Sequence, residues 1–185
     1  MPSPLGHALG GLAAGWAVAG PSAVDREPAR RQVWRTGALF AALGMLPDID
    51  LLFGAHSGPT HGLGAALIAG LVVLACRRQP RLALGAAAAY ASHTLLDWLG
   101  TDSSPPIGIK ALWPFAHAYY ESHLHLFGAI SRRYWLPGFV EQNVRAVAWE
   151  VLVLLPVVLV VHFGRQLLVT RQKEKGRNGR TRASF

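Results

Sequence analysis

The chain has 185 residues, enough for one domain, and it is 51% hydrophobic with only 15% charged residues. This composition is typical of a membrane protein and excludes an ordinary soluble domain. The formal net charge of +8 would also suit a nucleic-acid-binding protein, but the basic residues form short clusters between apolar segments and in the C-terminal tail. We therefore interpret the charge as a signal of membrane orientation and expect no nucleic-acid partner. A single cysteine, Cys76, excludes a disulfide within the chain.

Five apolar segments follow one another at about residues 4–20, 36–53, 58–76, 82–99 and 144–164. Each is about as long as the ~17–25 residues that a helix needs to cross the hydrocarbon core. The expected fold class is all-α: a multi-pass membrane helical bundle of about five transmembrane helices. The first segment ends in Ala17-Val18-Ala19-Gly20, which resembles a signal-peptidase site, but no Lys or Arg precedes Arg26. We therefore expect a retained helix.

The lysines and arginines predict the orientation of these helices, because connections rich in them stay on the cytoplasmic side. Basic residues follow the first, third and fifth segments: Arg26, Arg30, Arg31, Arg35, Arg77, Arg78, Arg81 and those from Arg165 to Arg182. The long connection over 100–147 is then periplasmic and the C-terminus cytoplasmic. We expect a membrane-embedded domain over 1–170 and a basic, disordered cytoplasmic tail over 171–185.

Ionisable side chains gather at the predicted periplasmic ends of the first four segments. They are His7, Asp48, Asp50, His56, His61, His93 and Asp97. A lone histidine in an apolar helix is more often a packed, hydrogen-bonded side chain, and we interpret His162 in this way. Ionisable groups inside a span are costly without partners, however, so His93 and Asp97 favour a functional interpretation. We expect the seven side chains to converge on one site.

The types and spacing of these residues indicate a metal site. His93 and Asp97 are four residues apart, which places them on one face of a helix. Pro47 favours an irregular segment in which two carboxylates point inward. Imidazole and carboxylate together suit zinc, manganese or iron, and contain too much nitrogen for a calcium site. We expect one to three divalent ions, with zinc as the first expectation.

In their order along the chain, the motifs resemble those of a known family. They are the early His7, Leu46-Pro47-Asp48-Ile49-Asp50, His56-Ser57-Gly58-Pro59-Thr60-His61, Ser92-His93-Thr94-Leu95-Leu96-Asp97 and Leu112-Trp113-Pro114-Phe115. They are similar to motifs of the YdjM family, bacterial inner-membrane proteins described as LexA-binding, predicted metal-dependent hydrolases. The resemblance extends to about Glu150. It departs at Ser57, where the family has arginine, so a phosphate-binding role does not transfer to that loop.

The resemblance implies a metal-dependent hydrolase, distantly similar to the helical fold of zinc phospholipase C and S1/P1 nuclease, and hence hydrolysis of a phosphoester. The expected substrate is a lipid, lipid-linked or small-molecule phosphoester. A metal-activated water would attack it while Asp50 or Asp48 accepts the proton. Arg132 and Arg133 are expected to bind the anion, with interfacial snorkelling as the alternative. Trp113 is expected beside the substrate, with seating in the bilayer interface as the alternative.

Two other functions are compatible with the sequence. One is a metal-stabilised membrane scaffold without turnover, in which the coordination sphere would be closed rather than open. The other is a regulatory membrane protein that binds a protein partner through its basic cytoplasmic tail, as the LexA-binding description of the family implies.

Overall fold

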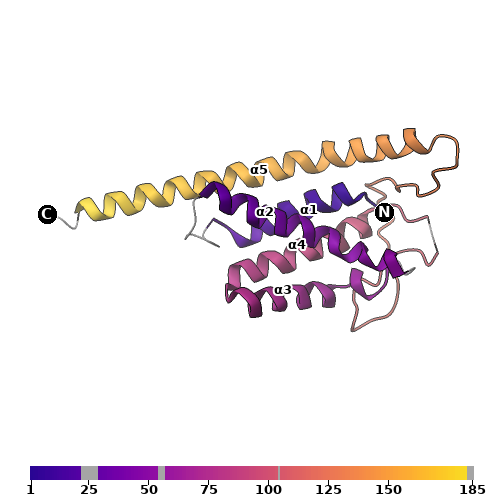
Figure 1. Cartoon of the computed structure of the whole chain (residues 1–185), viewed down its shortest axis with the longest axis horizontal. Coiled ribbons are helices and arrows are strands. Elements are labelled where there is room, and N and C mark those ends of the chain that lie inside the picture. The colour runs from indigo at the N-terminus through magenta and orange to yellow at the C-terminus, as the bar shows by residue number, and fades with distance from the viewer. Residues whose placement is uncertain (22–28, 54–56, 104, 183–185) are drawn as a thin grey trace.

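The computed structural model describes residues 1–21, 29–53, 57–103 and 105–182 (Figure 1). In these ranges the chain is helical and contains no strand. The elements are α1 (Pro4–Ala19), α2 (Ala29–Met45), the 3-10 helices η1 (Leu46–Phe53) and η2 (Pro59–His61), α3 (Leu63–Arg77), α4 (Pro80–Leu99) and α5 (Phe139–Arg182). The prediction of an all-helical fold is confirmed.

The helices lie where the apolar segments predicted them, but not all of them reach the length of a membrane span. Two stretches of the described chain are long and apolar enough: Val33–Phe53, which joins α2 to η1, and Phe139–Gln172 of α5. Helix α3 is apolar and shorter, and its 15 residues extend about 22 Å. The five-span topology therefore stays a prediction.

Helices α1 and α4 form the centre of the bundle. Helix α1 packs against α2, α4 and α5, and α4 also packs against α2 and α3. Glycines permit the closest approach, since a Cβ atom on Gly44 of α2 would overlap the backbone carbonyl oxygen of His7 in α1. This contact holds the end of α2 against the start of α1. Deeper in the bundle, the fully buried Phe40 packs against Gly15 and Gly85.

Helix α5 lies along one side of the bundle and extends beyond it at the C-terminal end (Figure 1). Its 44 residues span about 66 Å. The helix continues to Arg182, through the residues where the sequence predicted a disordered tail. The physical reason is that Arg, Gln, Lys and Glu, which fill positions 171–175, are strong helix formers and need only extend an existing helix.

The connection over 100–138 covers the end of the bundle at which α1, α3 and α5 begin. Its Leu112-Trp113-Pro114-Phe115 motif caps α3, because the carbonyls of Ala111 and Trp113 accept hydrogen bonds of 2.9 Å from the backbone N–H groups of Leu63 and Gly64. The first N–H groups of a helix have no partner inside the helix, so these two contacts fix where α3 starts.

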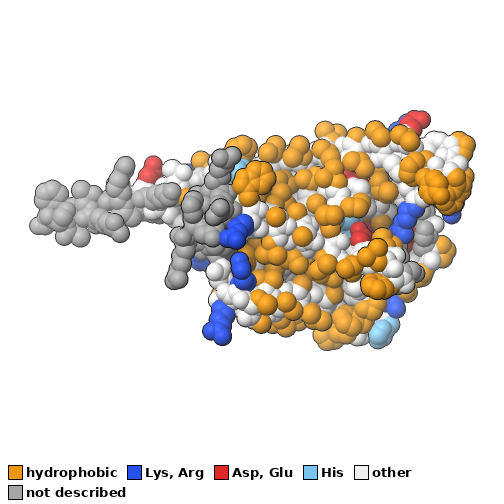
Figure 2. Space-filling view, viewed as in Figure 1, with side chains coloured by type: hydrophobic (Ala, Val, Ile, Leu, Met, Phe, Trp, Pro, Cys, Tyr) orange, Lys and Arg blue, Asp and Glu red, His pale blue; other side chains and the backbone are white. Residues whose placement is uncertain are grey.

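On the face seen in Figure 2, hydrophobic side chains are spread over the helices, and Lys and Arg lie toward the ends. Leu67 and Leu71 of α3 and Leu152 and Val160 of α5 are each more than half exposed. Such a continuous apolar surface suits contact with lipid rather than water.

Candidate metal centre

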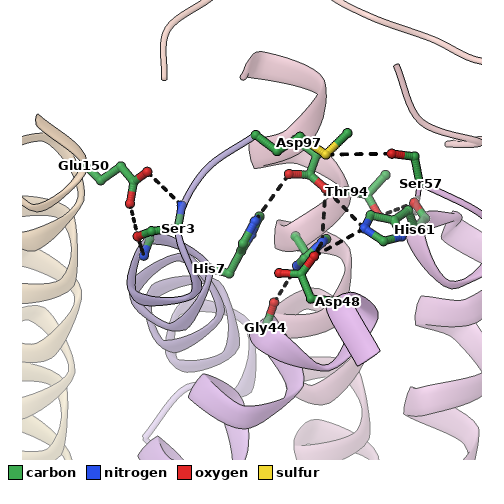
Figure 3. Close-up of polar contacts among 12 residues, drawn as sticks. Ser3, His7, Gly44, Asp48, Ser57, His61, Thr94, Asp97 and Glu150 are labelled. Carbon is green, nitrogen blue, oxygen red and sulfur yellow. Dashed lines mark hydrogen bonds and ion pairs between the residues drawn. The ribbon is translucent and has the colours of Figure 1, made fainter. Parts of the chain in front are cut away.

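Three imidazoles and three carboxylates meet at the end of the bundle that the connection covers (Figure 3). They come from four elements: His7 from α1, Asp48 and Asp50 from η1, His61 from η2, and His93 and Asp97 from α4. All are buried except Asp48, whose side chain is 21% exposed. The structure brings these six side chains together, and all of them except Asp50 face one centre. Their role as metal ligands stays a prediction.

Asp97 lies at the centre of the cluster. Its Oδ2 atom is 3.0 Å from His93 Nε2 and 3.4 Å from His61 Nε2, and its Oδ1 atom is 3.3 Å from His7 Nε2. Asp48 approaches from the other side, with Oδ1 3.6 Å from His61 Nε2 and 3.7 Å from His93 Nε2. Two carboxylates thus face the same set of imidazole nitrogens.

These separations fit a coordination sphere. Two donor atoms bound to one tetrahedral ion at ~2.0–2.1 Å lie roughly 3.3 Å apart. Two groups, His7 with Asp48 and His93, and His61 with His93 and Asp97, each offer donor atoms within 4.8 Å of one another. Within the described residues, His7 Nε2, His93 Nε2 and both Asp97 oxygens are buried and make no hydrogen bond. Because buried polar atoms rarely lack partners, this donor set fits a divalent cation.

A backbone carbonyl group fixes the orientation of the His93 ring. Its Nδ1 atom lies 2.8 Å from the carbonyl oxygen of Gly44, to which it donates, so Nε2 presents its lone pair toward Asp97 and Asp48 (Figure 3). Both donor groups include His93. Since its single available nitrogen binds only one ion, the two groups cannot use His93 for two separate ions.

Asp50 lies on the far side of the His61 ring from the cluster. Its Oδ2 atom is 3.3 Å from His61 Nδ1 and accepts a hydrogen bond of 3.0 Å from the Thr60 hydroxyl, whereas His61 Nε2 faces Asp97. Asp50 therefore orients His61, and the structure does not place it among the donors that face the centre.

Electrostatics in the cluster favour a cation. The turn η2, which carries His61, lies outside the two stretches of spanning length. Burial opposes a charge on His61, but its hydrogen bonds to Asp48 and Asp50 and the nearby Asp97 outweigh burial and raise its pKa to about 9. In the absence of a metal ion, a proton on His61 supplies the positive charge. Metal binding must displace that proton.

A cavity of about 500 Å³ opens beside the cluster, and Asp48 forms part of its wall. The connection contributes Ser131, Arg132 and Arg133 to the same cavity. Two of the three predicted substrate-binding residues therefore share a cavity with a candidate ligand. The third, Trp113, packs against the start of α3 and lines a separate, apolar groove.

Comparison with known proteins identifies the family of the chain. The model of the family described as YdjM inner membrane protein matches residues 1–168. The chain belongs to the YdjM family. That match covers the six clustered side chains, the cavity and the connection, and the family description makes this an inner membrane protein. No curated protein and no solved structure gives a match.

The other described histidines of this YdjM family member, His117, His123, His125 and His162, lie away from the centre. His56 falls outside the described residues. His162 packs near the far end of α1, with its ring 5.4 Å from Trp16 and its Nε2 atom 2.8 Å from the Gln166 amide nitrogen, in agreement with its interpretation as a packed side chain. His117, His123 and His125 are exposed on the connection.

Several residues that hold the cluster in place were not predicted from the sequence. The Thr94 hydroxyl donates to the His61 carbonyl at 2.8 Å. The fully buried Glu150 of α5 accepts hydrogen bonds from the backbone N–H of Ser3, at 2.8 Å, and from the Ser3 hydroxyl (Figure 3). Ser3 caps α1 one turn before His7. The sequence offered one signal for these supporting residues: Thr94 directly follows the candidate ligand His93.

Proposed function

We propose that this YdjM family member is a membrane-bound, metal-dependent hydrolase that cleaves a phosphoester at the periplasmic face of the bacterial inner membrane. One observation carries the proposal: a buried set of imidazoles and carboxylates lies beside a cavity that also contains two arginines. A purely structural metal site is closed, whereas turnover needs space beside the ligands for a substrate.

We propose zinc as the ion, with manganese or iron as alternatives. His93 and Asp97 would hold it together with His7, His61 and Asp48, whose donor atoms face the same centre. When bound, the ion would supply Lewis-acid chemistry, lowering the pKa of a water molecule and neutralising charge on a phosphoryl oxygen. Because only the Nε2 atom of His93 is available, a second ion would have to bind to other side chains of the cluster.

Asp48 is the better placed of the two predicted proton acceptors. It lines the cavity and is partly exposed, so a proton released there can reach it. Asp50 already accepts a hydrogen bond from Thr60 and is buried behind His61. We therefore assign the general base to Asp48 and treat Asp50 as a positioning residue for His61.

Arg132 and Arg133 are proposed to bind the anionic group of the substrate. The guanidinium group of an arginine can form two parallel hydrogen bonds to two oxygens of a phosphate, which a lysine cannot. Both line the cavity that contains Asp48. A phosphoester held by them would lie beside the candidate ligands, and its organic part would lie at the edge of the apolar helical surface. A lipid or lipid-linked phosphoester meets this requirement.

The basic residues at the opposite end of the bundle support a periplasmic placement of the site. Arg78 follows α3, Arg81 lies in the first turn of α4, and Arg165 donates a hydrogen bond of 2.9 Å to the Gly20 carbonyl after α1. By the positive-inside rule this basic end would be cytoplasmic and the site at the other end periplasmic. A reporter fused after residue 182 should behave as cytoplasmic and one inserted within 100–138 as periplasmic. The reverse pattern would overturn this orientation.

The catalytic proposal is tested by metal analysis of the protein purified in detergent, followed by hydrolysis assays on bis-p-nitrophenyl phosphate and on phospholipids. We expect bound zinc and hydrolysis in the wild type, and loss of both in His93→Ala. His117→Ala, which changes an exposed histidine of the connection, is the matched control and should keep both. If the wild type binds metal but cleaves no phosphoester at any pH, and if His93→Ala only lowers its stability, the protein is a scaffold.

A second function, binding of a protein partner in the cytoplasm, is favoured by the C-terminal part of α5. This part continues as a helix beyond the bundle and contains four of the basic residues of the chain, namely Arg171, Lys173, Lys175 and Arg177, within seven positions (Figure 1). Deletion of residues 171–185 separates the two functions. Loss of partner binding with phosphoester hydrolysis intact would support both, whereas unchanged partner binding would exclude this role for the helix end.

A further inference from the structure

A second, apolar cavity lies between η1 and α3 on the outside of the bundle. This groove has a volume of about 410 Å³ and is lined by Leu46, Ile68, Ala69, Val72 and Trp113, among others. That volume is within the range of ~300–1,000 Å³ typical of small-molecule sites. Among the described residues, no charged side chain lines it. A ligand in this groove is therefore held by apolar contacts.

The inner wall of the groove is joined directly to the candidate metal centre. Thr60 and Tyr90 supply the hydroxyl groups of this wall. The Tyr90 hydroxyl donates to the Thr60 carbonyl at 2.9 Å, and the Thr60 hydroxyl donates to Asp50 at 3.0 Å. Both hydroxyl groups are thus already engaged, so the groove offers a ligand hydrocarbon contacts while lying one residue from His61.

The groove runs in the direction expected for a lipid chain, from the level of the headgroup into the hydrocarbon. It begins beside Thr60 and Trp113, at the level of the metal centre, and follows α3 from Ala65 to Val73, away from that level. The rise of an α-helix from Ala65 to Val73 is about 12 Å. Its rim includes Ile68 and Val72, which are 53% and 55% exposed on the apolar surface of α3. The groove is therefore open to the hydrocarbon region along its length.

We propose that this groove binds one acyl chain of a phospholipid whose headgroup lies at the candidate metal centre. Two cavities flank the cluster, one with arginines and Asp48 in its wall and one apolar. Both cavities include a residue of η1, Asp48 in one and Leu46 in the other, so an amphipathic ligand lying across η1 would place an anionic headgroup in the first and a chain in the second. The assignment of this lipid as the substrate rests on the proposed hydrolase function, whereas binding of the chain in the groove does not.

Binding is tested by native mass spectrometry of the protein in detergent with added phosphatidylglycerol. We expect the wild type to retain one phospholipid. Val72→Trp obstructs the groove from its exposed rim, and Ala69→Phe fills its interior. Each should weaken retention by about tenfold, the loss expected when two methylene groups lose their apolar contacts. Leu67→Phe is the matched control, because Leu67 lies on the same helix, is 61% exposed and does not line the groove.

Hydrolysis provides the second measurement. Val72→Trp should reduce cleavage of phosphatidylglycerol about tenfold more than cleavage of bis-p-nitrophenyl phosphate, which has no acyl chain. Leu67→Phe should change neither. Val72→Trp is the primary variant because its side chain is at the surface, so folding is least disturbed, and circular dichroism checks this.

The outcomes distinguish the groove from the proposed enzyme. Selective loss of retention in Val72→Trp and Ala69→Phe supports the groove even when no phosphoester is cleaved, and in that case the hydrolase function fails alone. Equal retention in all variants, or a wild type that retains no phospholipid, overturns the groove. Equal loss of both hydrolytic activities in Val72→Trp overturns its role in substrate selection.

Discussion

The hydroxyl group of Thr94 shows how a side chain that is not itself a ligand controls the candidate metal centre. It lies one position after His93 in α4 and donates to the backbone carbonyl of His61. One helix thereby places its own imidazole and also fixes the turn that carries another. Loss of a group that orients a metal ligand typically lowers metal affinity 10–100-fold.

Replacement of Thr94 by valine keeps the shape of the side chain and removes this hydrogen bond. We expect zinc affinity to fall by roughly 10–100-fold and the free energy of unfolding to fall by about 1 kcal/mol. Zinc affinity is measured by competition with a chelating dye. Thr170→Val is the matched control, since Thr170 bonds only within α5, far from the centre. Unchanged zinc affinity in Thr94→Val would show that His61 is held by other contacts or is not a ligand.

At the same scale, the sequence predicts which residues meet but not the direction of each side chain. His7, Asp48, His93 and Asp97 could be placed together because each lies at the same end of an apolar segment. The placement of Asp50 behind His61 could not be predicted, because η1 is a 3-10 helix and its side chains follow a different period from those of an α-helix. Thr60 and Thr94 were missed because a hydroxyl group gives no signal in a pattern of charges.

Contact between α1 and α2 at Gly44 links helix packing to the cluster. The backbone of Gly44 touches that of His7 and Gly11, and its carbonyl accepts the hydrogen bond from His93. A single position thus sets the distance between α2 and the two helices, α1 and α4, that supply His7 and His93. The overlap involves backbone atoms, which cannot move aside as a flexible side chain can.

We predict that Gly44→Ala separates α1 from α2 and destabilises the protein by about 1–3 kcal/mol, as expected for an overpacked core. The amount of bound zinc per chain should fall with it. Thermal unfolding and metal analysis provide the two measurements. Gly164→Ala is the control, because a Cβ atom at Gly164 meets no neighbour. Normal zinc content in Gly44→Ala would contradict the dependence of the cluster on this contact.

Glu150 ties α5 to the start of α1, which carries His7. Its carboxylate accepts from both the backbone and the hydroxyl of Ser3, so Glu150→Gln leaves one buried donor without an acceptor. We expect a loss of about 1–3 kcal/mol in stability, together with weaker zinc binding as His7 shifts. Glu141→Gln, which changes an exposed carboxylate of the same helix, should change neither. A stable Glu150→Gln protein with normal zinc affinity would show that α5 does not position His7.

At the element scale, hydropathy predicted the helices well, because an apolar segment bounded by charges or prolines has few other structures available. The bounds of α4 differ from the predicted 82–99 only at the start. The role of the Leu112-Trp113-Pro114-Phe115 motif was not predicted. It acts on α3 through backbone carbonyls, and these are identical in every sequence. The length of α5 was underestimated because its end is polar.

For the whole molecule, the three carboxylates of the cluster, Asp48, Asp50 and Asp97, bring negative charge that a bound divalent cation would offset. Removal of a bound ion would leave the buried Asp97 with imidazole neighbours alone. We predict that extraction with a chelator lowers the melting temperature and that zinc restores it. The stabilisation should be about 2.7 kcal/mol at a zinc concentration 100 times the dissociation constant. His93→Ala should show no zinc-dependent shift, and a wild type that melts identically with and without zinc would contradict a bound ion.

All the clustered donors lie between residues 7 and 97, upstream of both the connection and α5. During synthesis the complete set therefore exists before the last 88 residues have been made. An ion that binds at this stage would enter a site that is not yet covered. The connection and α5 would then pack over it. In the complete chain the route to the ion would narrow to the cavity that Asp48 lines, so an ion captured early would exchange more slowly than it first bound.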